Sequence, residues 1–235
     1  MVRFFDLINS NWIDPKRSSG HYTDSVPFPH IIMDEFLTQS ALSGLQDGDV
    51  EVQSAFGSVE ILEYLQILTG KERRLLTDPY SLRDSQFELL KQEPIHTDYS
   101  KHLSFNLDRR LNLLLFANSA PEAGRVGVEL YGKTESRFIE AKSNRCLIFD
   151  TTDFSPHSVV AETGMGSSVR VLNIYFYSCG RPMSELFESV APVVGDDDGR
   201  LPSIKDSAKK LIKQWVPPIL FGRKTVETKR VTGRD

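Results

Sequence analysis

Two residues that can ligate a metal ion stand two positions apart in the segment EPIHTDYSKHL, and they are His96 and Asp98. The chain has only five histidines. On a β-strand, side chains two positions apart project from the same face, so an imidazole nitrogen and a carboxylate oxygen would converge on one point. A third ligand should then come from a distant strand of the same sheet. The segment FSPHSVV supplies His157 at the start of an expected strand.

Two histidines and one carboxylate leave coordination positions open. This arrangement suits a non-haem Fe(II) ion that must also bind a co-substrate and oxygen. A closed structural zinc site would need four protein ligands, usually including cysteine, and Cys146 and Cys179 lack that spacing. Chance often produces H-x-D, so two polar residues on an ordinary exposed strand remain the alternative interpretation.

A basic residue, Arg170, opens the otherwise apolar segment VRVLNIYFYS, thirteen residues after His157. Strand alternation puts Arg170 on one face with Leu172, Ile174 and Phe176. A guanidinium among core residues is costly unless it meets an anion, and a carboxylate fits its planar fork. The alternative is an arginine at the frayed start of a strand that pairs with an acidic loop residue.

The elements that must position these residues are short β-branched or aromatic segments separated by Gly, Pro, Asn, Ser or Thr. Strands that recur about every ten residues, without helices between them, predict an antiparallel sandwich or barrel. The expected strands lie at 109–118, 125–132, 137–141, 145–151, 157–162 and 169–178.

Helices are expected on both sides of this β-rich stretch. A strand-like run and a short helix share residues 27–47, and a second helix begins after Ser58 and ends at Gly70. The segment SIKDSAKKLIKQW predicts an amphipathic helix near the C-terminus. We therefore expect a single domain, with helical support at about 1–93, a β core at about 94–180 and a C-terminal loop and helix at 181–235.

Composition favours a globular cytoplasmic protein, since 40% of the residues are apolar and 26% are charged. No apolar run is long enough for a membrane span, and two cysteines beside apolar runs suggest reduced thiols. The net charge is −4, but residues 201–235 hold nine Lys or Arg against three Asp or Glu. A solvated helix face explains this basic tail better than a nucleic-acid site does.

Four segments together resemble the Fe(II)/2-oxoglutarate-dependent oxygenases of the prolyl 4-hydroxylase-like branch. The family signature is H-x-D, then a distal His, then a basic residue, and it occurs here in that order between about Pro94 and Ser178. The resemblance implies an α+β, mainly β fold, in which N-terminal helices support a double-stranded β-helix (jelly-roll) core. The segments are HTDYSKHLSFNLDRRLNLLLFAN, GRVGVELYG, SNRCLIFDTTDFSPHSV and SSVRVLNIYFYS.

By position in the family motif, the resemblance implies that His96, Asp98 and His157 hold the iron. It also implies that Arg170 pairs with the far carboxylate of 2-oxoglutarate. The strand LNLLLFA would floor the co-substrate pocket, and apolar walls would keep water away from the reaction. The residues expected to line the pocket or its walls are Asn112, Leu114, Phe116, Ile148, Ile174 and Phe176.

This sequence departs from the family pattern at two places. Family members often carry a tyrosine where Phe116 stands, and Phe116 cannot donate a hydrogen bond, which leaves Asn112, Thr151 or a water for that contact. The usual Trp and paired glycines before Glu-Leu are missing from SAPEAGRVGVELYG. The loop beside the substrate therefore differs from that of the relatives.

The resemblance implies a hydroxylase that uses Fe(II), 2-oxoglutarate and O2 and releases succinate and CO2, with ascorbate open as a further cofactor. Its substrate would be proline, another free or peptidyl amino acid, or a small metabolite. One alternative is a non-catalytic β-sandwich or cupin-like binding protein with a structural metal or none. In a third hypothesis the basic tail recruits nucleic acid or a protein partner.

Overall fold

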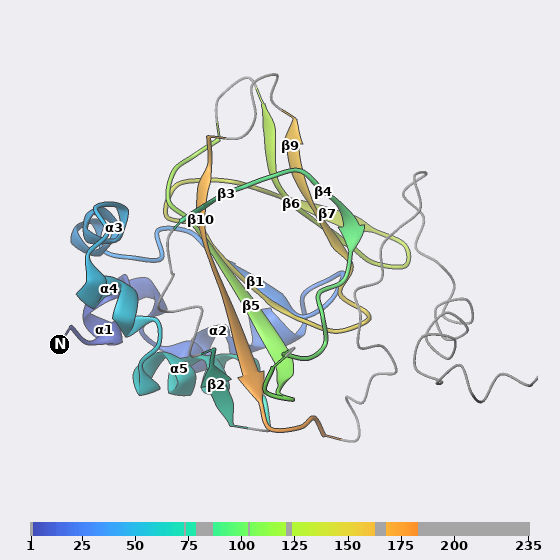
Figure 1. Cartoon of the computed structure of the whole chain (residues 1–235), viewed down its shortest axis with the longest axis horizontal. Helices are drawn as coiled ribbons and strands as arrows, with labels where there is room; N and C mark the ends of the chain where they lie inside the picture. Colours follow the sequence, from blue (N-terminus) through green and yellow to red (C-terminus); the bar gives the residue numbers. More distant parts are fainter. Residues whose placement is uncertain are drawn as a thin grey trace, which may run out of the picture. The chain divides into compact units, whose positions relative to one another are not determined.

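Two antiparallel β-sheets face each other in the computed structural model of the chain (Figure 1). The structure describes residues 2–72, 74–78, 87–102, 104–120, 124–162 and 168–182. One sheet has six strands in the order β1-β8-β5-β10-β2, with β3 also paired to β10, and the other has the order β4-β9-β6-β7. The predicted mainly β architecture with antiparallel sheets is confirmed.

The strands of the β-rich stretch agree closely with the ranges predicted from the sequence. Only the short strands β2 and β3 have no counterpart among the predictions. The strands are β1 (His30–Met33), β2 (Leu75–Thr77), β3 (Glu88–Leu89), β4 (Glu93–His96), β5 (Asp108–Phe116), β6 (Arg125–Tyr131), β7 (Ser136–Glu140), β8 (Cys146–Asp150), β9 (His157–Glu162) and β10 (Arg170–Ser178).

Helices gather on one side of the six-stranded sheet, as Figure 1 shows. The helix expected after Ser58 is confirmed: the Ser58 hydroxyl accepts from the Ile61 amide at 3.4 Å, and Gly70 ends the helix in the left-handed conformation. The helices are α1 (Phe4–Leu7), the 3-10 helix η1 (Ser10–Trp12), α2 (Pro15–Thr23), α3 (Gln39–Gln46), α4 (Val50–Ala55) and α5 (Val59–Thr69).

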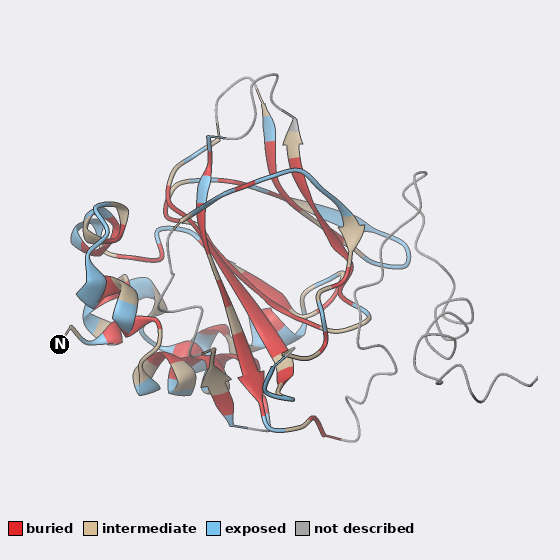
Figure 2. Ribbon diagram, in the orientation of Figure 1, coloured by how far each residue is buried: buried red, intermediate tan, exposed pale blue. Residues whose placement is uncertain are grey.

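The six-stranded sheet separates two apolar clusters, and Figure 2 shows β5 and β10 buried over most of their length. Because alternate residues of a strand face opposite ways, each of these strands contributes to both clusters. The helix-side cluster includes Leu113, Ile148, Leu172, Ile174 and Phe176 together with residues of all five α-helices. The inter-sheet cluster includes Leu114, Phe116, Val128, Phe149, Val159 and Val171.

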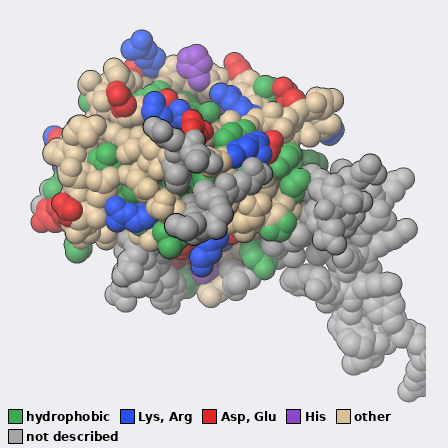
Figure 3. All heavy atoms as spheres, turned by 90° about the horizontal axis from the view of Figure 1, so that it is seen from above, with side chains coloured by type: hydrophobic (Ala, Val, Ile, Leu, Met, Phe, Trp, Pro, Cys, Tyr) green, Lys and Arg blue, Asp and Glu red, His purple; other side chains and the backbone are tan. Residues whose placement is uncertain are grey.

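The described residues all lie in one compact unit, Met1–Pro202. The amphipathic helix and basic tail expected near the C-terminus, like the extension of one domain to residue 235, fall outside the described residues. In the part of the chain that the structure describes, no helix has the length and apolar character of a membrane span. Both Cys146 and Cys179 are free thiols. On the face shown in Figure 3, basic and acidic side chains are interspersed.

Candidate metal centre

The structure brings His96, Asp98 and His157 together at one end of the four-stranded sheet. One ligand atom from each lies within 4.8 Å of the others. His96 ends β4 and His157 begins β9, and the two residues are direct cross-strand partners with ring centroids 4.5 Å apart. Asp98 lies two residues beyond the end of β4 rather than within it. The sequence spacing predicted the convergence, although the strand ends earlier than expected.

Both histidine rings of the cluster are oriented by backbone carbonyls two residues upstream. Nδ1 of His96 lies 2.8 Å from the Pro94 carbonyl oxygen, and Nδ1 of His157 lies 3.2 Å from that of Ser155. A carbonyl oxygen only accepts, so each Nδ1 carries a hydrogen and Nε2 is the ring nitrogen left for a metal. Nε2 of His96 also lies 3.5 Å from a carboxylate oxygen of Glu93. Burial lowers the pKa of His157, which favours the neutral form that binds metals.

The two oxygens of the Asp98 carboxylate have different surroundings. The Tyr175 phenol donates a hydrogen bond of 3.0 Å to Oδ1, and Nη1 of Arg109 lies 3.7 Å from the same oxygen. Oδ2 is buried and has no hydrogen-bond partner among the described residues. Because a buried carboxylate oxygen without a partner is costly, Oδ2 is the atom available to a bound cation.

A cavity of about 590 Å³ opens beside the two histidines, between the sheets. Its wall on the six-stranded sheet carries Asn112 of β5 and Asn173 of β10, and the Oδ1 atoms of both are buried without a hydrogen-bond partner in the described structure. Unpaired buried polar atoms are uncommon in folded proteins and call for a bound ligand or water. The further lining residues are Glu88, Leu89, Leu90, Lys91, Glu93, Leu114, Val159, Val171 and Tyr175.

Arg170 does not line this cavity, whereas the sequence analysis expected it on the inward face. Its side chain is exposed and its guanidinium carbon lies 5.3 Å from the ring centroid of Phe87, a residue that packs on the helix-side cluster. The alternation along β10 was predicted correctly, but the opposite face lines the cavity, through Val171 and Asn173. Val169, which lies two positions before Val171 and just before β10, is buried in the inter-sheet cluster.

Of the other residues expected around the pocket, Asn112 and Leu114 line the cavity. Phe116 is fully buried in the inter-sheet cluster but is not part of the cavity wall. Thr151 is buried too, and its amide donates to the Arg110 carbonyl outside the cavity.

Three residues predicted as apolar cavity walls belong to the opposite side of the sheet. They lie on the face of the sheet that packs against the helices. This is the face of Leu172 and is opposite to that of Val171. The three are Ile148, Ile174 and Phe176.

Sequence reasoning missed Asn173, Tyr175 and Arg109. The first two break the apolar run of β10 at alternate positions, so their shared face could have been recognised as the polar, ligand-facing one. Arg109 could not have been found this way. A register shift between Phe176 and Tyr177 pairs Arg109 with Tyr177, and the guanidinium lies 3.8 Å from the Tyr175 ring centroid.

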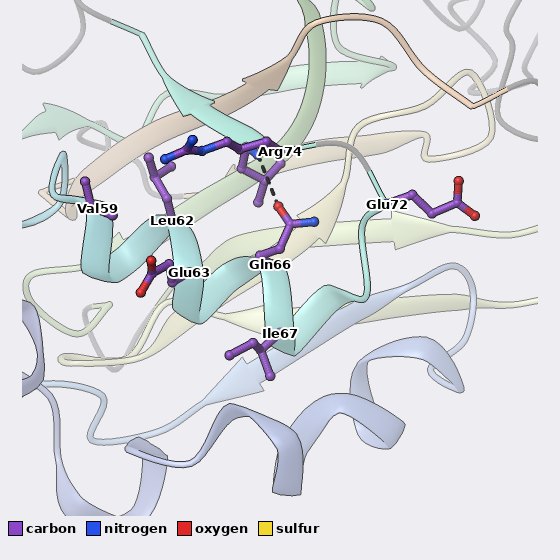
Figure 4. Close-up of a pocket in the computed structure, with 8 residues that line it drawn as sticks. Val59, Leu62, Glu63, Gln66, Ile67, Glu72 and Arg74 are labelled. Atoms are coloured by element: carbon purple, nitrogen blue, oxygen red, sulfur yellow. Dashed lines mark hydrogen bonds between the residues drawn. The ribbon is translucent and has the colours of Figure 1, made fainter.

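A second concavity, of about 580 Å³, lies along α5 and β2 (Figure 4). Its apolar lining residues include Val59, Leu62 and Ile67, and the side chain of Gln66 accepts a hydrogen bond from the Leu75 amide at 3.1 Å. Among the described residues, the one cluster of three or more potential metal ligands is that of His96, Asp98 and His157. The α5 concavity therefore offers no comparable chemistry.

Solved structures similar to this chain include two prolyl 4-hydroxylases and a protein with nickel and 2-oxoglutarate bound. A prolyl 4-hydroxylase from Pseudomonas putida is 12% identical, with 72% of this chain and 96% of that one covered and a TM-score of 0.48. One from Phytophthora capsici is 15% identical, with coverage of 84% and 70% and a TM-score of 0.47. HygX from Streptomyces hygroscopicus, with nickel and 2-oxoglutarate bound, is 10% identical, with coverage of 82% and 94% and a TM-score of 0.42.

No protein-family model matches the chain, and a comparison with curated proteins finds no match.

Proposed function

We propose that this protein is an Fe(II)- and 2-oxoglutarate-dependent oxygenase that hydroxylates an unactivated C–H bond. The observation that carries the proposal is the convergence of His96, Asp98 and His157 at the edge of a polar cavity between two sheets. The proposed products from the co-substrate are succinate and CO2. O2 as second co-substrate, ascorbate as an additional cofactor and a cytoplasmic location stay predictions.

The strand order supports the double-stranded β-helix expected for such an enzyme. In both sheets, neighbours in space are mostly distant in sequence: β1-β8-β5-β10 in one and β4-β9-β6-β7 in the other. Consecutive strands thus alternate between the two sheets through most of the β-rich stretch, which is how a jelly roll is wound. The proposed oxygenase domain contains the helices as a support layer behind the six-stranded sheet.

The three residues of the cluster fit a ferrous ion. Two neutral imidazoles would each present Nε2, and Asp98 would present the oxygen that lacks a protein partner. A set of two histidines and one carboxylate leaves positions for a co-substrate and O2, as a 2-oxo acid oxygenase requires. The negative charge of Asp98 would offset part of the metal charge in this largely buried place.

Asn112 and Asn173 are the residues proposed to hold the far end of 2-oxoglutarate, in place of Arg170. Each side-chain amide can turn an N–H toward a carboxylate or an oxygen toward a donor. They come from adjacent strands, with Asn112 opposite Tyr175 and Asn173 opposite Leu114, and so lie on the same inward face. Lys91, at the exposed side of the cavity, is the one cationic residue among its described lining residues.

When bound, iron and 2-oxoglutarate together supply the oxidising chemistry, and the protein orients the reactants and limits access by water. The Pro94 and Ser155 carbonyls fix the two imidazole rings before a ligand arrives. Leu114, Val159 and Val171 form the apolar part of the cavity wall and exclude water beside the cluster. The Asn112 and Asn173 amides supply the polar part.

The proposed primary substrate is an amino-acid or peptidyl residue, with proline as the first candidate, or a small metabolite. The sequence resemblance supports this choice, while the altered loop before Glu129 distinguishes the chain from the relatives it resembles. Oxygen-dependent succinate release across a panel of free amino acids, peptides and small metabolites would identify the substrate.

Anaerobic reconstitution with Fe(II) and 2-oxoglutarate tests the proposed function. A visible charge-transfer band is expected from the wild-type protein, and it should disappear in His96→Ala because one ligand of the metal is lost. His21→Ala is the matched control, since that histidine is exposed on α2. No band from the wild type, or an undiminished band from His96→Ala, would count against the proposal. Metal binding without the band would favour the non-catalytic binding protein.

A further inference from the structure

The phenol of Tyr175 contacts the candidate ligand Asp98 from the neighbouring sheet. Tyr175 lies on β10 of the six-stranded sheet, and Asp98 follows β4 of the four-stranded sheet. The phenol donates to Oδ1 over 3.0 Å, whereas Oδ2 has no described partner. The two carboxylate oxygens, which are chemically equivalent in water, are therefore made unequal by one side chain.

Two contacts hold the Tyr175 side chain in place. The phenol donates to Asp98 Oδ1, and the Arg109 guanidinium lies over the ring at 3.8 Å. A ring packed against a guanidinium is restricted in its orientation, so the hydroxyl stays beside Asp98.

The Tyr175 hydroxyl can act toward Asp98 only as a donor. A carboxylate accepts hydrogen bonds and cannot donate them, so the hydrogen between the two groups belongs to the phenol. Arg109 adds a positive charge 3.7 Å from the same oxygen. Both groups thus draw electron density toward Oδ1, whereas Oδ2 is buried without a described hydrogen-bond partner.

We infer that Tyr175 is a positioning residue that restricts Asp98 to a single ligating oxygen, Oδ2. The inference rests on the proposed function and adds to it the reason why the coordination positions stay open. A carboxylate with both oxygens free can chelate a divalent cation and would occupy a position that the co-substrate needs. With Oδ1 bound by the phenol, Asp98 supplies one ligand atom only.

The experiment compares Tyr175→Phe with the wild type after loading with Co(II), whose visible spectrum reports coordination number and geometry. The variant removes one hydroxyl and keeps the ring that packs on Arg109. We expect a changed Co(II) spectrum and about tenfold weaker binding of 2-oxoglutarate to the Co(II)-loaded protein, because the carboxylate now competes for an open position. Co(II) itself should still bind.

Tyr177→Phe is the matched control, since it removes a phenol from the same strand that contacts Arg109 but not Asp98. Its spectrum and 2-oxoglutarate affinity should equal those of the wild type. An unchanged spectrum together with unchanged 2-oxoglutarate affinity in folded Tyr175→Phe would overturn the inference. Failure of the wild type to bind Co(II) would instead contradict the proposed function, so the two failures are distinguishable.

A second variant decides the matter if Tyr175→Phe does not fold, as judged by its thermal melting curve. Arg109→Met removes the guanidinium that lies over the Tyr175 ring and beside Oδ1 of Asp98, and leaves the phenol itself in place. We expect a Co(II) spectrum, recorded without 2-oxoglutarate, that is shifted in the same direction by a smaller amount. A spectrum identical to that of the wild type in this variant would then overturn the inference.

Discussion

Two buried aspartates lie on opposite sides of the six-stranded sheet and have opposite hydrogen-bonding states. Asp150, at the end of β8, accepts from the Tyr22 hydroxyl through Oδ1 and from Lys71 Nζ through Oδ2 at 2.7 Å. Asp98, on the inter-sheet side, has one oxygen bound by protein and one without a described partner. Both oxygens of Asp150 are bonded to groups that hold helices against the sheet. Asp98 has one oxygen without a described partner, which can bind a ligand.

Two buried histidines show the same contrast. In His30, Nδ1 lies 2.8 Å from the Phe28 carbonyl oxygen and Nε2 lies 3.1 Å from Nη1 of Arg137, so both ring nitrogens have protein partners. In His157, Nδ1 has its carbonyl partner, and Nε2 is available to the cluster. A buried polar side chain that has an atom available for a further bond indicates a functional site more clearly than burial alone does.

The largest effect on stability is expected when Asp150 loses the cation of Lys71. Lys71→Met leaves Asp150 buried with a reduced set of partners, and breaking a buried ion pair in this way costs about 3–5 kcal/mol of unfolding free energy. Urea denaturation measures the loss. The double variant Lys71→Met with Asp150→Leu should recover much of it, and a loss below about 1 kcal/mol in the single variant would contradict the structural role of the pair.

On the inter-sheet side, removing a polar group should cost function and not stability. Asn112→Leu removes a buried amide whose oxygen has no described partner, so the unfolding free energy should change little or rise slightly. Binding of 2-oxoglutarate to the metal-loaded protein should weaken by about tenfold, as measured by calorimetric titration. A variant that is strongly destabilised yet binds normally would reverse the comparison between the two sides.

Arg170→Ala is the matched control for that variant and should have a much smaller effect. Its side chain is exposed over Phe87 and does not line the cavity. The affinity for 2-oxoglutarate should change by less than about twofold, as is usual for a surface substitution away from a site. Loss of binding in Arg170→Ala with normal binding in Asn112→Leu would restore the role that the sequence resemblance implied.

The smallest effect concerns the pH dependence of stability contributed by His30. Burial lowers the pKa of His30 below its ordinary value, so in acid the unfolded chain binds a proton that the folded protein resists. Stability is therefore retained above about pH 6.5 and falls as the pH drops below it. Urea unfolding at several pH values should show a shallower decline for His30→Gln than for the wild type, and equal slopes would contradict this assignment.

The strands and the α5 helix could be predicted from the sequence, because apolar residues recur every two positions in a strand and every three or four in a helix. The convergence of His96, Asp98 and His157 could be predicted from the order of the motif. The sequence was insufficient for deciding which face of β10 looks inward. Alternation defines two faces equally well, and only the packing of helices against Leu172, Ile174 and Phe176 determines which one is covered.

The position of Arg109 was beyond sequence reasoning for a different reason. It depends on the register shift between β5 and β10, which no pattern of residue types indicates. The sequence analysis placed Arg170 among core residues because it opens an apolar strand, whereas its side chain is exposed. The first residue of a strand is often exposed, as Arg170 is here.

The central claim is that His96, Asp98 and His157 hold one divalent metal ion. The most direct measurement is an anomalous difference map from crystals grown anaerobically with Fe(II), recorded at the iron absorption edge. We expect a single strong peak coordinated by Nε2 of both histidines and by Oδ2 of Asp98, with Oδ1 still bound to the Tyr175 phenol. No peak between these three side chains, or a peak held elsewhere in the molecule, would contradict the account.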